Sequence, residues 1–416
     1  MTSHIPFALA SDGFWPLFLQ ALTLQAGYNA ALVAVGAGLL GLAGGGAGAF
    51  IFLRKRALVS DAVSHATLPG VGLAFIVMVA LGGDGRWLPG LLIGSAATAA
   101  IGLFAVEWIT RRTRLAQDAA IGAVLSVFFG LGIVLLTVVQ TMSAGRQAGL
   151  GSFLLGSTAG MLWSEALIIA AAGALAAALV FALRRPMTLV AFDPDYAAAS
   201  GVDVRLTDLA IMGLALIVTV IGLKIVGLVL IVALLIIPAV TARFWTDRVD
   251  HLIGIAALAG GAAGYLGAAL SAAADKLPTG PIIVLAAFAI FALSLLFSPL
   301  RGVLASALKR RRFQQRAHAR QGLLSLARGE PIHDRLTLRI LRQRGWIRAD
   351  GVATLDGRAA AAKALRDEAR WELLRRATGE NPLAERYDGL TPIEQVMTAD
   401  QIAELDARLG RPEAVT

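Results

Sequence analysis

Long apolar stretches alternate with short polar breaks over the first 300 residues, and the apolar stretches then stop. Each stretch has about 17–25 residues, enough for an α-helix to cross a hydrocarbon layer of roughly 30 Å. We therefore predict an all-α polytopic membrane protein with eight or nine transmembrane helices, after a short interfacial helix at 14–24. The predicted spans are 28–53, 57–80, 88–109, 119–141, 162–183, 207–223, 226–243, 252–272 and 282–298.

The pattern beyond residue 300 is that of a small, polar, helical domain. Amphipathic helices are expected at 316–327, 332–344 and 358–376, with a turn at Asp350-Gly351 after the second. This order predicts an α-rich, winged-helix-like domain. The expected organisation is a transmembrane domain at 1–300, a basic linker at 301–315 and a winged-helix-like domain at 316–416.

Composition and charge support this division. The chain is 57% hydrophobic and only 16% charged, which points to the bilayer as its solvent. Residues 300–416 hold 22 basic and 15 acidic residues, so they carry +7 of the total +9. Basic clusters also mark alternate loops, at 54–56, 111–114, 184–185 and 243–248. Positive loops stay inside, so we expect a multi-pass protein of the bacterial inner membrane with a cytoplasmic C-terminal domain.

Three further features narrow the function. Glycines at 41, 44, 45 and 48 give the first span a surface that another helix can approach closely. Cysteine is absent, which excludes disulfides and thiolate metal sites. The sequence also lacks a G-x-x-x-x-G-K-[ST] loop, so ATP-driven transport would need a separate ATPase chain. The chain itself is expected to be a transport subunit and not an enzyme.

The candidate metal ligands are Asp61 and His65, four residues apart on one face of the second span. Ionisable residues inside spans commonly mark ion pathways, and a carboxylate with an imidazole suits manganese, iron or zinc. Two ligands make an incomplete site, which a second permease copy would complete. Pro69, followed by Gly70, is expected to break the helix beside this pathway. In the alternative interpretation, Asp61 caps the helix and His65 bonds to a neighbouring carbonyl.

Other polar residues carry weaker signals. Glu107, Glu165, Asp208 and His251 lie near predicted helix ends, where capping or snorkelling accounts for them. The loop after the fifth span has a helix start at Asp193-Pro194, a short body with Asp195 and Tyr196, and a stop at Gly201. A rigid cytoplasmic helix of this kind is what an ATPase partner would push on.

These residues carry a resemblance to a known family. The run D-x-x-S-H-x-x-L-P-G at 61–70, the loop at 191–201 and Leu-Leu-Ile-Ile-Pro-Ala-Val-Thr-Ala at 234–242 resemble the permeases of manganese, zinc and iron ABC importers, over about residues 25 to 300. The resemblance implies that Asp61 and His65 are pathway metal ligands. It also implies that residues 191–201 form the coupling helix that contacts the ATPase.

The C-terminal region is similar to iron- and manganese-dependent repressors, including a tail at 393–405 like their dimerisation segment. Gln395 stands where those regulators place a histidine ligand, and their other His and Cys ligands are missing. We therefore expect a structural, assembly or ATPase-tuning role for this domain. Nucleic-acid binding is not expected.

The sequence thus predicts the permease subunit of an ATP-driven importer of divalent metal, with manganese first and zinc or iron as the other choices. No permanently bound cofactor is expected; the metal is cargo. Expected partners are a cytoplasmic ABC ATPase, a periplasmic or surface metal-binding protein, a second permease copy or paralogue, and membrane lipid. Two alternatives are a membrane-anchored, metal-responsive DNA-binding regulator and a proton-driven secondary metal transporter.

Overall fold

The computed structural model describes residues 13–85, 87–142, 163–273, 277–377 and 389–410. The chain divides into two compact units, which we call unit 1 (residues 1–303) and unit 2 (residues 304–416). The described residues contain only helices and a single isolated β-bridge. The prediction of an all-α polytopic membrane protein is confirmed in these residues, because eight of the helices are long and apolar enough to span a membrane.

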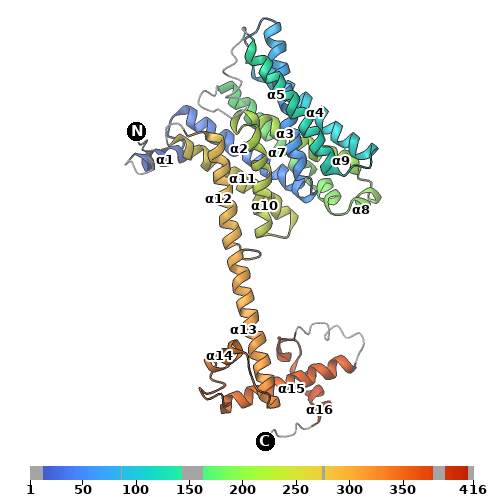
Figure 1. Ribbon diagram of the computed structural model, residues 1–416, viewed down its shortest axis with the longest axis vertical. Coiled ribbons are helices and arrows are strands. Elements are labelled where there is room, and N and C mark those ends of the chain that lie inside the picture. Colours follow the sequence, from blue (N-terminus) through green and yellow to red (C-terminus); the bar gives the residue numbers. More distant parts are fainter. Residues whose placement is uncertain (1–12, 86, 143–162, 274–276, 378–388, 411–416) are drawn as a thin grey trace. The chain divides into compact units, whose positions relative to one another are not determined.

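Unit 1 begins with a short helix and continues with the spans (Figure 1). Helix α10 contributes a shorter apolar segment, Ile231–Trp245, beside the eight candidate spans in the described residues. The helices are α1 (Phe14–Leu22), α2 (Tyr28–Leu53), α3 (Ala57–Ala80), α4 (Leu88–Arg112), α5 (Gln117–Thr141), α7 (Trp163–Phe192), α8 (Pro194–Ala199), α9 (Val204–Ile225), α10 (Leu228–Trp245), α11 (Val249–Ala272) and α12 (Thr279–Phe297).

Helix α7 is longer than the sequence predicted. The expected span ended at residue 183, but α7 continues through Pro186 to Phe192. A proline inside a helix removes one amide donor, here the one that would reach the Ala182 carbonyl, and the next stop signal is the capping residue Asp193. The longer helix carries the chain directly to the start of α8.

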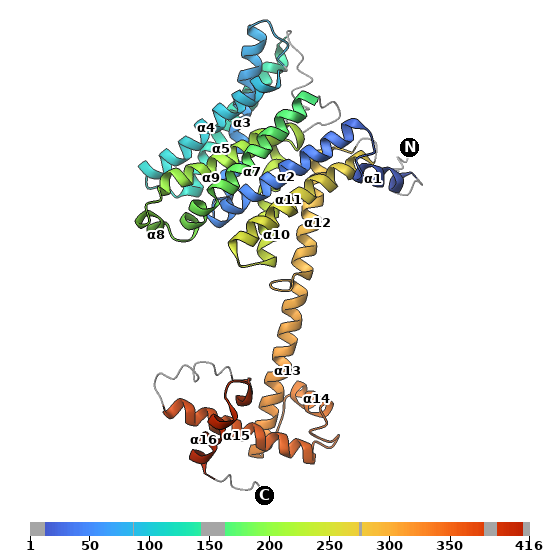
Figure 2. The ribbon, with the colours of Figure 1, turned by 180° about the vertical axis from the view of Figure 1, so that it is seen from behind.

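Helices α2 and α11 pack closely through small residues (Figure 2). A Cβ atom on Gly41 would lie 2.1 Å from the carbonyl oxygen of Gly260, and one on Gly45 would lie 2.1 Å from that of Ala256. Any larger side chain would therefore push the two backbones apart. The predicted packing surface on the first span is confirmed, and it fixes α2 at the centre of unit 1.

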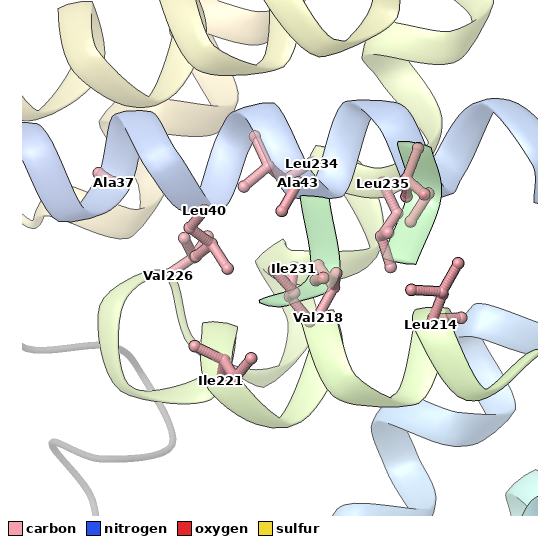
Figure 3. Close-up of a cluster of buried hydrophobic side chains, with 14 of the residues drawn as sticks. Ala37, Leu40, Ala43, Leu214, Val218, Ile221, Val226, Ile231, Leu234 and Leu235 are labelled. Carbon is pink, nitrogen blue, oxygen red and sulfur yellow. The ribbon is translucent and has the colours of Figure 1, made fainter. Parts of the chain in front are cut away.

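The main apolar cluster of unit 1 joins α2, α9 and α10 (Figure 3). Leu40 of α2 lies among Val218 of α9 and Ile231 and Leu234 of α10, and all four side chains are buried. Between spans this packing acts through van der Waals contact, because the surrounding lipid is as apolar as leucine. The cluster holds α9 against α2, and so fixes the segment that follows α8.

Apart from Val303, the last residue of unit 1, the remaining elements lie in unit 2: α13 (Val303–Arg328), α14 (Arg335–Gln343), α15 (Leu355–Ala377), the 3-10 turn η2 (Ile393–Gln395) and α16 (Ala399–Leu409). Helix α13 already begins at Val303, so most of the stretch expected as a basic linker at 301–315 is helical. Alanine, lysine, arginine and glutamine dominate residues 303–315 and favour a helix, and neither Gly nor Pro occurs between Val303 and Gly322.

A short hairpin separates α14 from α15. The amide of Thr354 donates to the Trp346 carbonyl over 3.0 Å, and the amide of Arg348 donates to the Val352 carbonyl over 2.9 Å. Ile347 and Ala353 form an isolated antiparallel bridge. This places a turn where the sequence predicted one, at Asp350-Gly351.

An ion cluster ties α15 to α16. The guanidinium of Arg370 donates to both carboxylate oxygens of Asp406, over 2.6 and 2.5 Å, and to Asp367 over 2.9 Å. The hydrogen bonds from Arg370 hold the pKa of Asp406 below its usual value. Burial raises the pKa of the Asp367 carboxyl. The buried Trp371 and Leu405 belong to one apolar cluster, which together with these ion pairs packs α16 against α15.

Candidate functional site

Asp61 and His65 lie on one face of α3, as their spacing predicted. The Nε2 atom of His65 is 3.5 Å from Oδ1 of Asp61. The histidine side chain is 19% exposed and the aspartate side chain 41%, so the carboxylate is the more open of the two. A carboxylate oxygen and an imidazole nitrogen therefore converge on one point at the surface of this span.

The neighbours of His65 leave one of its nitrogens without a partner. Its ring meets the edge of Phe129 on α5, with ring centroids 5.1 Å apart and planes at 89°. Its Nδ1 atom is buried and makes no hydrogen bond. The alternative in which His65 bonds to a neighbouring carbonyl is therefore not what the structure has. Nor does Asp61 cap α3, because Arg56 is the residue at that position.

The pair is an incomplete ligand set. Among the described residues, no group of three or more His, Cys, Asp or Glu side chains is close enough to hold a metal ion. Divalent transition metals usually take four or more ligands. Further ligands must come from water, backbone carbonyls or another chain.

The predicted helix break at Pro69 and Gly70 is wrong, because α3 runs unbroken from Ala57 to Ala80. Proline has no amide hydrogen, so it cannot donate to the carbonyl four residues back, and that carbonyl belongs to His65. The helix tolerates this loss because neighbouring helices pack tightly around it. A Cβ on Gly132 of α5 would lie 3.3 Å from the Pro69 ring, and one on Gly70 would lie 2.1 Å from the Gly94 carbonyl oxygen of α4.

An ion cluster next to this site was not predicted from the sequence. Arg54 Nη2 donates to Asp208 Oδ2 over 2.8 Å, and Arg56 Nη2 donates to the same oxygen over 3.3 Å. Asp208 is only 8% exposed, so it neither caps α9, a role that Asp203 fills, nor snorkels to the surface. The available signal was a carboxylate within an apolar span together with two arginines flanking the ligand motif.

The short helix expected after the fifth span is confirmed as α8 (Figure 1). The Asp193 carboxylate accepts from the amide of Tyr196 over 2.9 Å, and Pro194 occupies the first turn. Gly201 ends the element with φ +83°, a conformation that favours glycine. Ala197 is buried, whereas Tyr196 is 60% exposed, so α8 shows an aromatic side chain on a rigid support.

The contacts of Arg54 place the two sites at one end of unit 1. Its Nη1 donates over 2.9 Å to the carbonyl of Val190, which is four residues before the start of α8. Asp61 is the fifth residue of α3, about 6 Å along the helix axis from its start. The metal-ligand pair therefore lies toward the same end as α8.

Comparisons with known proteins agree on one family. The sequence model of the ABC 3 transport family matches residues 28–298. The chain is 39% identical over 308 residues to the manganese transport system membrane protein MntC of Bacillus subtilis, covering 74% of this chain and 70% of that one. It is 38% identical over 291 residues to the zinc transport system membrane protein TroC of Treponema pallidum, covering 70% and 96%.

A solved structure extends the likeness to three dimensions. One chain of PsaBC from Streptococcus pneumoniae, determined in complex with a Fab, matches with a TM-score of 0.59 and 29% identity. The match covers 69% of this chain and 97% of that chain. The family match ends at residue 298, before unit 2.

Proposed function

Because this chain belongs to the ABC 3 transport family, we propose that it is the membrane permease of an ATP-driven importer of divalent metal ions. Manganese is our first choice of cargo, with zinc or iron as the others. The observation that carries the proposal is the Asp61 and His65 pair, a hard oxygen and a borderline nitrogen 3.5 Å apart within a span. The names of the two sequence relatives, a manganese and a zinc transport protein, support the choice of cargo.

We propose that Asp61 and His65 hold the metal near the cytoplasmic end of the pathway. A carboxylate and an imidazole bind a dication through their deprotonated atoms, and the Nε2 atom of His65 already faces the carboxylate of Asp61. A second permease copy would bring an equal pair and complete a four-ligand set.

The remaining partners follow from the absence of an ATP-binding motif in the sequence and from the exposed side chains of unit 1. A separate ABC ATPase would bind α8 through Tyr196 and supply the energy. A metal-binding protein outside the inner membrane would deliver the ion to the opposite end of the bundle. Lipid surrounds the many exposed leucine, isoleucine and phenylalanine side chains of α4, α5 and α12.

The proposal is tested by metal accumulation in lipid vesicles that hold the native chain, its ATPase and its binding protein. Radioactive manganese should accumulate only when ATP is present on the side of α8, and collapse of a proton gradient should leave the rate unchanged. Vesicles without the binding protein are the control. Uptake that continues without ATP and stops when the gradient collapses would show a secondary transporter instead.

For unit 2, we propose a cytoplasmic location and a role in tuning the ATPase. The basic charge after the last span supports the location. The order α13, α14, hairpin, α15 supports the winged-helix-like interpretation, while Gln395 in η2 gives no reason to expect metal sensing. In the same vesicles, a chain ending at Val303 should transport as many ions per ATP as the native chain but hydrolyse ATP at a different rate. A fall in the number of ions transported per ATP would contradict a tuning role.

A further inference from the structure

We propose that the ion cluster of Arg54, Arg56 and Asp208 transmits the movement of α8 to the ligand-bearing helix α3. This inference rests on the proposed function, because it assumes that an ATPase displaces α8 and that Asp61 and His65 meet the metal. The three residues are positioning residues: they touch neither cargo nor nucleotide. We call them the arginine-aspartate link.

The first observation is that one guanidinium joins the two chain segments that enter and leave α8. Arg54 Nη1 donates to the Val190 carbonyl of α7 over 2.9 Å, and Nη2 donates to Asp208 of α9 over 2.8 Å. Helix α8 lies between these two acceptors in the sequence. A displacement of α8 relative to the rest of unit 1 therefore changes the geometry around Arg54.

The second observation is that a tight turn connects the link directly to α3. Arg56 directly precedes the first residue of α3, and its Nη2 atom shares the Asp208 oxygen over 3.3 Å. Lys55 between the two arginines has φ +56°, a left-handed conformation that few non-glycine residues adopt. The amides of Lys55 and Arg56 donate back to carbonyls at the end of α2, both over 3.0 Å. The turn is thus tight, and α3 carries any shift of Arg56 rigidly to Asp61.

The third observation is that the link has unused hydrogen-bonding capacity. Arg54 Nε and Asp208 Oδ1 are both buried and lack a hydrogen-bond partner. Arginine and carboxylate commonly pair through two parallel bonds, and Nε with Nη2 facing both Asp208 oxygens would form such a pair. That arrangement would give Arg54 Nε and Asp208 Oδ1 hydrogen-bond partners and would change the hydrogen bond from Arg54 to the Val190 carbonyl. The same residues therefore support two arrangements, which is what a conformational relay requires.

The test compares ions transported with ATP hydrolysed in vesicles holding the complete transporter. Arg54→Lys keeps the positive charge but replaces the two guanidinium nitrogens that contact Val190 and Asp208 by a single nitrogen on a shorter side chain. Asp208→Asn removes the charge that both arginines share. Both variants should keep the ATPase rate within about twofold while the number of ions per ATP falls about tenfold, in the range of ordinary coupling between sites.

The matched control is Asp247→Asn. Asp247 also pairs with two arginines, Arg301 over 2.6 Å and Arg243 over 3.2 Å. Arg301 follows α12 and Arg243 lies on α10, so this cluster contacts neither α3 nor the segments beside α8. This variant should leave the ratio of ions to ATP unchanged. An unchanged ratio in Arg54→Lys and Asp208→Asn would overturn the proposal. Equal losses of hydrolysis and uptake in both variants would overturn it as well, because they would indicate a purely structural role.

A second measurement serves if Asp208→Asn does not fold. The chain has no cysteine, so spin labels at Ala198→Cys on α8 and Leu58→Cys on α3 would be specific, and both positions are exposed. In the assembled transporter the distance between the labels should respond to ATP in the native background and lose that response with Arg54→Lys. A response that survives Arg54→Lys contradicts the link. Absence of ATP-driven uptake in the native transporter would instead contradict the proposed function.

Discussion

Replacement of Asp61 or His65 by alanine is expected to abolish metal uptake while the protein still reaches the membrane. Each substitution removes one of the two ligands that this chain offers, and a two-fold pair would lose two of four. Loss of groups that merely orient a metal ligand already costs about 10–100-fold, so loss of the ligand itself should reduce uptake about 100-fold or more. The measurement is uptake of radioactive manganese and zinc by cells that hold the variants at equal membrane levels.

Glu107→Ala is the matched control for these substitutions. Glu107 and Arg111 form an ion pair four residues apart on α4, the same spacing as Asp61 and His65, with no role in the proposed pathway. Its loss should leave uptake within about twofold, because partly exposed pairs contribute little. Full uptake in both Asp61→Ala and His65→Ala would mean that the pair is not on the metal pathway.

A large effect is also expected at α8, where Tyr196→Asp should release the ATPase and stop ATP-driven uptake. Tyr196 is 60% exposed on a helix fixed by Asp193 at its start and Gly201 at its end. Exposed aromatic side chains on rigid supports often dominate protein interfaces, and replacing one by a charge costs about 2 kcal/mol or more, roughly a thirtyfold loss of affinity. The measurement is the amount of ATPase that copurifies with the permease from membranes.

Tyr28→Asp is the control for Tyr196. Tyr28 is a similarly exposed tyrosine at the start of α2. Arg54, which contacts the segments on either side of α8, follows the opposite end of that helix. ATPase recovery should not change in this variant. If Tyr196→Asp also retains the ATPase, α8 is not the main contact, and the energy must enter through another cytoplasmic element.

The spans and the ligand pair were predictable because each depends on local pattern. The first two predicted spans have the bounds of α2 and α3, since a polar Arg-Lys-Arg turn separates two apolar runs. The spacing of Asp61 and His65 alone places both on one helix face. The glycines of α2 predicted a close neighbour, although only the structure identifies it as α11.

Features that depend on contacts between distant segments were not predictable. Pro69 looked like a helix break, but packing around α3 outweighs one lost hydrogen bond, and the fifth span was expected to end at residue 183 although α7 continues through Pro186. Asp208 looked like a helix-end residue because its partners, Arg54 and Arg56, are about 150 residues away in the sequence. The segment at 303–315 looked like a linker because its charge concealed its strong helix propensity.

The most direct measurement of metal at Asp61 and His65 is pulsed EPR of Mn²⁺ on the transporter, without nucleotide or binding protein, with the permease labelled with ¹⁵N-histidine. The chain has five histidines, so native protein should be compared with His65→Gln. The proposed pathway predicts a nitrogen hyperfine coupling in the native transporter that disappears in His65→Gln. A coupling that persists in His65→Gln, or bound manganese without any coupling in the native transporter, would contradict it.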